Sequence, residues 1–253
     1  MTKFLLLIAL MFAAPLCAQI KLDPPGDRIF VLDKAELLSD IDREQIRTTC
    51  DAVLTQKAIP IVVVTITTMA AYGGGGMSIE AFAGALFNQW GVGHPEIHGK
   101  PWNKGILFLI STGDRKARIE LGAGWDPSFD RVCLDIMNNL IIPEFKAGRF
   151  SEGIKAGVEG LQAMAMGQEL PTRPISWQAI LLIAAFIGLM IFTVVSLIRR
   201  GSSGWAWVFW GVVFSVLGMF LLHMLTRGGR GGGFRGGSFG GGFSGGGGAS
   251  GSW

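Results

Sequence analysis

Short apolar runs alternate with amphipathic stretches across residues 28–170. The runs Ile59–Thr67 and Gly105–Ile110 are almost continuously apolar, which is typical of strands buried on both faces. Phe30–Leu32 is a shorter strand candidate, and Ala117–Leu121 alternates apolar and charged residues, as a more exposed strand does. Strands interspersed with helical stretches predict an α/β layered sheet that is mainly parallel, with one hairpin between its last two strands.

Helical stretches lie between and after these strands. Ser39 and Ser78 are suitable N-cap residues, and each precedes apolar residues at helical spacing. Beyond the last strand, helical periodicity extends over 130–142, is interrupted by Pro143 and resumes over 151–166. The predicted sheet therefore has helices between and after its strands.

Longer apolar runs lie outside this segment. Residues 1–18 combine Lys3, an apolar run and small residues at the end, which predicts a cleaved signal peptide followed by a linker over 19–27. Residues 177–198 and 205–225 contain no Asp, Glu, Lys or Arg, and each exceeds the ~20 residues that cross a bilayer as a helix. We therefore predict two transmembrane helices.

Two arginines orient these helices. Arg199 and Arg200 lie between the two runs, and the positive-inside rule places them in the cytoplasm. Together with an exported N-terminus, this places the domain 28–170 on the periplasmic side of the inner membrane and returns the end of the chain to that side. In 227–253, 15 of 27 residues are glycine, so the tail 226–253 is predicted to be disordered.

The net charge changes meaning once its distribution is known. The whole chain carries +3, but residues 19–175 contain 16 basic and all 19 acidic residues, a net charge of −3. A uniformly basic nucleic-acid-binding domain is therefore excluded. The tail superficially resembles arginine- and glycine-rich RNA-binding segments, but its predicted position outside the cell argues against a nucleic-acid partner.

Cysteine and histidine residues offer weak candidates only. Cys50 and Cys133 would remain after signal cleavage, either as one disulfide or, as we favour, as buried thiols on separate helices. His94 and His98 lie in a glycine- and proline-rich loop without a third ligand nearby, so we expect solvated loop residues there rather than a zinc site.

Aspartates follow three of the predicted strands. Asp33, Asp114 and Asp130 could converge on a hard cation such as calcium or magnesium. The predicted hairpin opposes this, because its two strands end at opposite edges of the sheet, and aspartates also serve as turn formers and helix caps. Arg115 and its cationic neighbours suit either a phosphate contact or a charged sheet edge. Residues 19–175 contain no P-loop, no G-x-G-x-x-G after a strand, no G-x-S-x-G and no H-E-x-x-H motif.

Several of these segments together resemble one family. The segments that carry the resemblance are Phe30-Val31-Leu32-Asp33, Trp90-Gly91-Val92-Gly93, Asn103-Lys104-Gly105-Ile106-Leu107, Asp114-Arg115-Lys116-x-Arg118-Ile119-Glu120-x-Gly122 and Gly148-Arg149-Phe150. Over about 28–166 the chain resembles the TPM domain. That resemblance implies a three-layer α/β/α sandwich, similar to Rossmann and flavodoxin folds. Some relatives bind calcium or a similar ion, and chloroplast relatives are linked to photosystem repair and acid phosphatase activity.

This sequence departs from the family pattern near Asn103. The acidic residue usual before that turn is here Trp102, Lys104 precedes Gly105, and an extended loop covers 94–102. We expect this loop beside the proposed site. If the acidic residue is a metal ligand in relatives, its replacement by Trp102 argues against metal binding here.

Two functions remain open. The first is a membrane-anchored, exported accessory or binding protein for membrane-protein maintenance, with the membrane and its proteins as partners. The second is a divalent-metal-dependent acid phosphatase-like hydrolase, with Asp33, Asp114 and Arg115 as candidate catalytic residues and calcium or magnesium held by Asp33, Asp114 and Asp130.

Overall fold

The computed structural model describes residues 20–93, 96–97, 99–171, 177–200, 204–226 and 244–253, and the predicted signal peptide, His94 and His98 lie outside them. One five-stranded sheet organises the domain, in the order β1-β2-β5-β6-β7. Its strands are β1 (Val31–Asp33), β2 (Ile61–Ile66), β5 (Ile106–Ser111), β6 (Lys116–Gly122) and β7 (Ser244–Ser252).

The sheet is mixed. Strands β1, β2 and β5 are parallel, whereas β6 pairs antiparallel with both β5 and β7. The predicted parallel centre and the single hairpin at the end of β5 are therefore present. A separate short hairpin joins β3 (Glu96–Ile97) and β4 (Lys100–Pro101).

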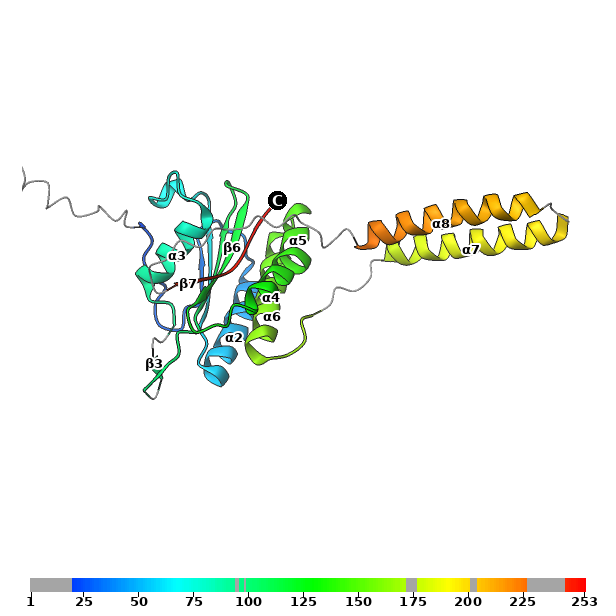
Figure 1. Ribbon diagram of the computed structural model, residues 1–253. Helices are drawn as coiled ribbons and strands as arrows, with labels where there is room; N and C mark the ends of the chain where they lie inside the picture. Colours follow the sequence, from blue (N-terminus) through cyan, green and yellow to red (C-terminus); the bar gives the residue numbers. More distant parts are fainter. Residues whose placement is uncertain (1–19, 94–95, 98, 172–176, 201–203, 227–243) are drawn as a thin grey trace, which may run out of the picture.

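Helices cover both faces of this sheet (Figure 1), as expected for an α/β layered fold. One face carries α3 (Ile79–Trp90) and the short 3-10 turn η1 (Ala70–Tyr72). The other face carries helices from four segments of the chain. These are α2 (Asp40–Lys57), α4 (Phe129–Ile136), α5 (Ile142–Lys146) and α6 (Phe150–Met166), with a π-helical turn η2 (Met137–Ile141) joining α4 to α5.

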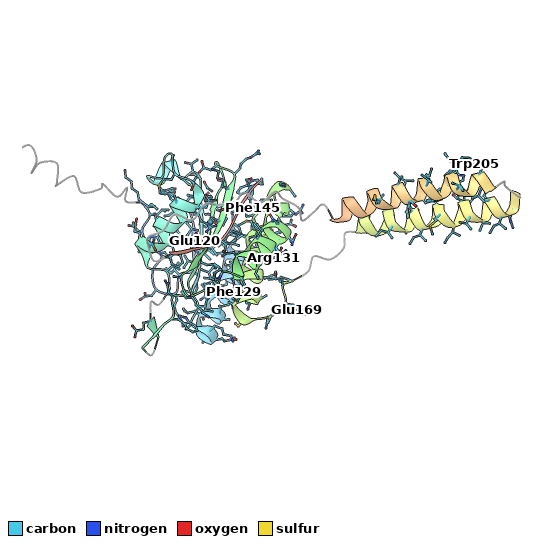
Figure 2. The ribbon with its side chains drawn as sticks, in the orientation of Figure 1. Glu120, Phe129, Arg131, Phe145, Glu169 and Trp205 are labelled. Atoms are coloured by element: carbon cyan, nitrogen blue, oxygen red, sulfur yellow. The ribbon has the colours of Figure 1, made fainter. Side chains whose placement is uncertain are left out.

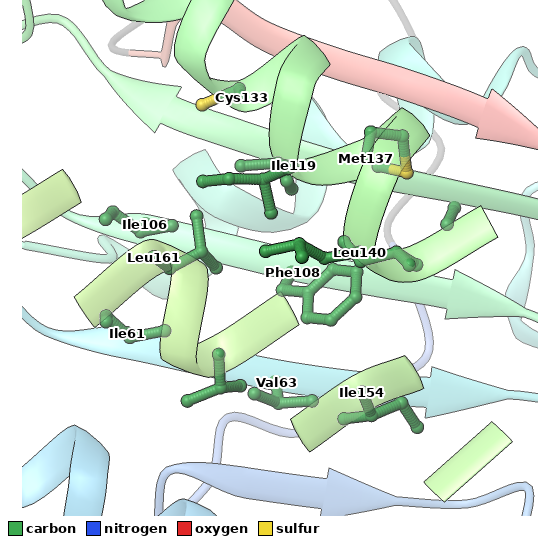
Figure 3. Close-up of a cluster of buried hydrophobic side chains, with 14 of the residues drawn as sticks. Ile61, Val63, Ile106, Phe108, Ile119, Cys133, Met137, Leu140, Ile154 and Leu161 are labelled. Atoms are coloured by element: carbon green, nitrogen blue, oxygen red, sulfur yellow. The ribbon is translucent and has the colours of Figure 1, made fainter. Parts of the chain in front are cut away.

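The side chains of alternate residues in the central strands point into two hydrophobic cores. Val63 of β2 and Phe108 of β5 point into the larger core, against Ile154 and Leu161 of α6 (Figure 3). Their neighbours in each strand pack under α3 instead. All six residues of β2 and of β5 are buried, which confirms that these two runs are strands covered on both faces.

The local signals for the helices also hold. The side chains of Ser39 and Ser78 accept hydrogen bonds from the backbone N–H of Asp42 and Ala81, which caps α2 and α3. Pro143 lies in the first turn of α5, where proline is tolerated because that N–H lacks an intrahelical acceptor. The predicted interruption is thus a π turn that redirects the chain.

The prediction for β6 was wrong in one respect. The segment is a strand, but six of its seven residues are buried rather than partly exposed. The cause is β7, which pairs along the whole length of β6 and makes β6 an interior strand of the sheet.

The prediction that 226–253 is entirely disordered was also wrong. Residues 244–252 form β7, which runs between α3 and α4 (red in Figure 1), and Thr226 still belongs to a helix. Glycine-rich sequences cannot form a core of their own, but here the apolar partners come from the rest of the domain. Residues 227–243 lie outside the described part of the chain.

Two helices connect the domain to β7. These are α7 (Trp177–Arg200) and α8 (Gly204–Thr226), which pair with each other away from the sheet (Figures 1 and 2). In the described residues one stretch, Leu181–Arg199 in α7, is long and apolar enough to cross a membrane, and 6% of its most apolar window is buried. α8 contains a shorter apolar stretch, Val208–Met219.

Candidate functional site

Asp33 ends β1 and is almost enclosed by donors. Its side chain is 2% exposed. One carboxylate oxygen accepts the N–H of Leu37 and the hydroxyl of Thr65, and the other accepts the N–H of Leu38 at 3.0 Å and a guanidinium N–H of Arg43 at 3.4 Å. Burial alone would raise the pKa of Asp33, but these hydrogen bonds outweigh it and hold the pKa below its usual value. Asp33 is therefore ionised and locks the start of the following segment.

Asp114 lies in the turn between β5 and β6. Its Oδ2 accepts the hydroxyl of Ser111 at 2.6 Å and the N–H of Met69 at 2.8 Å. These two bonds lower the pKa of Asp114, that from Ser111 most strongly. Asp114 thereby ties the turn after β5 to the loop after β2.

Asp33 and Asp114 therefore follow parallel strands at the same edge of the sheet, as the sequence suggested. β2 lies between their strands, with Thr65 facing both Asp33 and Ile110. Two strand spacings separate the backbones by roughly 10 Å at that level. Arg115, which follows Asp114, is exposed and has a positive φ of 52° in the turn.

Asp130 lies elsewhere. It is in the first turn of α4, and its Oδ1 accepts the N–H of Gly248 in β7 at 2.6 Å. Asp130 is thus occupied by the C-terminal strand, whereas Asp33 and Asp114 lie at the far end of β6. Among the described residues, no three His, Cys, Asp or Glu side chains are grouped so as to hold a metal ion. The structure therefore does not bring Asp33, Asp114 and Asp130 together, and calcium or magnesium binding stays a prediction.

Trp102 and Lys104 are also remote from the Asp33–Asp114 edge. The indole N–H of Trp102 donates to the carbonyl of Ala58 at 3.1 Å, and the ammonium of Lys104 lies 5.0 Å from the Trp102 ring centroid. Ala58 precedes β2 and Lys104 precedes β5, so both residues lie where the parallel strands begin. The expectation that this loop adjoins the proposed site was wrong, because Asp33 and Asp114 lie where those strands end.

A second polar group lies on the face of β6 that is covered by α3. Arg118 and Glu120 form an ion pair of 2.7 Å, with side chains only 8% and 2% exposed. Figure 2 shows Glu120 inside the domain. The alternating pattern predicted a more exposed strand here, and it gave no sign of the buried pair. Their spacing of two residues already put both on one face of β6. Their burial also depends on β7, the strand paired with β6, which is more than 120 residues away in the chain.

The Arg118 guanidinium also reaches β7. It donates to the carbonyl of Gly247 at 2.9 Å and to that of Gly246 at 3.4 Å. Nearby, the hydroxyl of Ser250 donates to Glu80 of α3 at 2.5 Å. Burial would raise the pKa of Glu80, but the Ser250 bond, local hydrogen bonds and the charge of Arg118 together lower it. One buried cation and two carboxylates, Glu80 and Asp130, thus contact the backbone and side chains of β7.

The two cysteines are buried free thiols, on α2 and α4, as favoured from the sequence. Burial raises the pKa of both Cys50 and Cys133 to about 12. Thiols this far from ionisation are poor nucleophiles, and they carry no site.

Comparisons with known proteins identify the family. The TPM-domain family model matches residues 31–164. Among solved structures, the chain is similar to an N-terminal domain from P. gingivalis, at 29% identity and a TM-score of 0.47, covering 55% of this chain and 83% of that one.

Two further solved structures are similar. The N-terminal domain of cg2496 from Corynebacterium glutamicum has 16% identity and a TM-score of 0.43, covering 60% of this chain and 91% of that one. The BA42 protein of Bizionia argentinensis has 19% identity and a TM-score of 0.39, covering 55% and 87%. No curated protein matches. Since the family model spans more than half of the 253 residues, the chain belongs to the TPM-domain family.

Proposed function

We propose that this TPM-domain protein is a membrane-anchored binding protein, whose domain is held at the extracytoplasmic surface and contacts membrane proteins there. The observation that carries the proposal is the position of β7. The chain leaves the domain after α6, passes through α7 and α8, and returns to the same sheet. A chain that crosses a bilayer in α7 must cross back before it can supply β7.

This return supports two crossings. The domain is connected to the start of α7 and to the end of α8, so it would stay next to the bilayer. Arg199 and Arg200, at the end of α7, lie at the opposite end of the helical pair. Arginines at that end agree with a cytoplasmic turn. The domain would then lie outside, within reach of the exposed parts of neighbouring membrane proteins.

The state of the carboxylates favours binding over catalysis. The oxygens of Asp33 accept bonds from four protein groups, and Asp130 is bonded to β7. General acids and metal ligands need oxygens that can reach a substrate or an ion. These side chains instead stabilise the fold.

Site-specific photo-crosslinking in membranes tests this proposal. Ile41 in α2 is 73% exposed, so a photoreactive amino acid at that position samples the outer surface of the domain. We expect discrete adducts with integral membrane proteins, and none of the same adducts from a probe at Ser202 in the turn between the helices. Adducts with soluble proteins alone, or no adducts from several domain positions, would contradict the proposal.

A phosphomonoester hydrolase is the second candidate. Asp33 and Asp114 favour it, because they lie at one edge of the sheet and their lowered pKa values keep both ionised. The crowding of Asp33 by protein donors ranks this candidate second, since little coordination is left for calcium or magnesium. Asp114→Asn should abolish acid phosphatase activity of the purified chain if the candidate is correct, whereas the exposed control Asp126→Asn should not. Equal activity in both variants would eliminate it.

A further inference from the structure

Strand β6 would be an open sheet edge without β7. Its seven residues would expose unpaired backbone groups and the apolar side chains of Ala117, Ile119 and Leu121, which are now fully buried. Such edges readily pair with other strands. We call the channel along β6, between α3 and α4, the β6 groove; in this structure β7 fills it.

The β6 groove is selective for glycine. A Cβ at Gly248 would lie 1.9 Å from the carbonyl oxygen of Ile119, and its φ of +118° disfavours any other residue. At Gly251 a Cβ would lie 2.7 Å from side-chain atoms of Met137 and Ile142. Between them Ala249 is 5% exposed and packs in the larger core. The groove therefore reads the side-chain size at successive positions of its strand.

Polar contacts hold that strand against three elements of the domain. Asp130 accepts the N–H of Gly248, Arg118 donates to the carbonyl of Gly247, and Glu80 accepts the hydroxyl of Ser250. The first two bonds use backbone groups that any residue supplies, so the register depends on the side chains. A strand shifted by two residues would place either Trp253 or Ala249 at the position of Gly251, where a Cβ has no room.

Trp253 completes the contact at the end of the chain. Its ring lies 4.7 Å from that of Phe145 and 5.9 Å from that of Phe150, both edge-on. Aromatic side chains seated in apolar surroundings commonly dominate the energy of peptide binding. A tryptophan after a glycine-rich strand thus gives the β6 groove a recognisable ligand.

A long connection separates α8 from β7 in the sequence. Seventeen residues, 227–243, link Thr226 to Ser244, and a chain of that length spans up to about 60 Å when extended. We propose that the β6 groove is a peptide-binding site for glycine-rich segments of the pattern Gly-Gly-Ala-Ser-Gly-Ser-Trp, and that the tail of this chain is its exchangeable resident ligand. This deepens the proposed function, on which it rests for the setting, by naming the partner chemistry.

The exchange has a defined consequence at the membrane. A tail tethered to its own domain acts at an effective concentration of about millimolar. Free peptide at a lower concentration therefore does not displace it from the β6 groove. Neighbouring copies carry the same tail at a comparable local concentration when crowded in a bilayer. The groove of one copy then accepts the tail of another, which links the two chains without a new interface.

Peptide binding in detergent tests the site independently of topology and of membrane partners. The chain ending at Phe243 is titrated into a fluorescent peptide of residues 244–253, and anisotropy is recorded. We expect the peptide to bind the shortened chain saturably. It should bind the intact chain at least tenfold more weakly, because β7 already fills the groove there. Peptides with Gly248→Ala or Gly251→Ala should bind at least tenfold more weakly, whereas Ser252→Ala, at an exposed position, should bind normally. Equal binding of all peptides, or none to a folded shortened chain, would overturn the proposal.

A second measurement covers a shortened chain that fails to fold. Lys116 and Ser252 are paired, and the N–H of Trp253 donates to the carbonyl of Arg115, so they form a non-hydrogen-bonded pair. Their Cα atoms should then be about 4.5 Å apart, within disulfide range. Full-length Lys116→Cys and Ser252→Cys chains are mixed in one membrane and oxidised. A disulfide between one Lys116→Cys chain and one Ser252→Cys chain supports exchange. If no such dimer forms, although a chain that carries both substitutions forms the disulfide internally, the exchange proposal is overturned.

Discussion

Arg118 and Glu120 show how one residue pair serves both the core and the C-terminal strand. A buried guanidinium is tolerated only if its donors find acceptors. Glu120 supplies one set of acceptors and the carbonyls of Gly246 and Gly247 supply another. The sequence placed both charged residues on one face of a strand, but it could not show their burial, because that depends on β7.

Glu120→Gln should destabilise the protein strongly. It leaves the Arg118 guanidinium without its carboxylate partner in the interior, and breaking such buried pairs typically costs about 3–5 kcal/mol of the free energy of unfolding. Urea unfolding, followed by tryptophan fluorescence in detergent, measures this. The matched control is Glu44→Gln, which removes an exposed ion pair with Arg47 and should leave the midpoint almost unchanged. Equal midpoints for both variants would show that Arg118 has other sufficient partners.

Asp33 should make stability depend on pH in the acid range. Its folded pKa is lowered, so its contribution is fully present above the unfolded value of about 4 and is lost as the pH falls through the folded pKa. Asp33→Asn should therefore be clearly less stable than the natural chain at pH 7, and the difference should shrink below pH 4. Unfolding midpoints at a series of pH values, with exposed Asp27→Asn as control, test this. A difference that grew on acidification would have the wrong sign.

At the scale of elements, the sequence predicts what local patterns determine. Helices α2 and α3 begin at their serine caps, and strands β2 and β5 were identified by continuous apolar runs. β7 could not be identified in this way, because glycine has low strand propensity and no apolar side chain. Its conformation comes from the partners in β6, α3 and α4, which are contacts between distant parts of the chain.

The same limit applies to the candidate site. Strand order placed Asp33 and Asp114 at one edge, since both follow parallel strands. Asp130 was grouped with them although the predicted hairpin already argued against it, and β6 does run antiparallel and end at the opposite edge. The donors that occupy Asp33, from Thr65 and Arg43, come from other elements and leave no signal in the residues beside it.

Gly251→Val should release β7, although valine has the higher strand propensity. The added side chain has no room beside Met137 and Ile142, and packing outweighs propensity where neighbouring side chains are this close. Hydrogen exchange of the β6 amides should accelerate at least tenfold. Ser252→Val, which adds a similar side chain at an exposed position next in the strand, should leave exchange unchanged or slow it. Acceleration in Ser252→Val alone would contradict the packing argument.

At the scale of the whole molecule, β7 returns the chain to the domain. The domain, the helical pair and residues 244–252 form a closed path, because the sheet contains residues from both sides of α7 and α8. That path requires an even number of bilayer crossings, which the two predicted spans satisfy. The predicted cytoplasmic position of the arginines rests on the positive-inside rule and needs its own test.

Thiol labelling in spheroplasts should show this orientation. Glu169→Cys, at an exposed position after α6, should react with a membrane-impermeant maleimide in intact spheroplasts, whereas Ser202→Cys should react only after lysis. The natural chain is the background control, because Cys50 and Cys133 are buried and their pKa values are raised to about 12. Labelling of Ser202→Cys from outside would exclude a cytoplasmic turn.

Pairing of β6 with β7 in the membrane is the central claim, and a double cysteine variant measures it most directly. Full-length Lys116→Cys/Ser252→Cys, at paired positions of the two strands, is oxidised in native membranes, and its mobility is compared before and after reduction. We expect a disulfide at 116–252, within one chain or between exchanged tails, and none in the matched variant Lys57→Cys/Ser252→Cys, whose first position lies at the end of α2. Free thiols at 116 and 252 under the same oxidation would contradict the account.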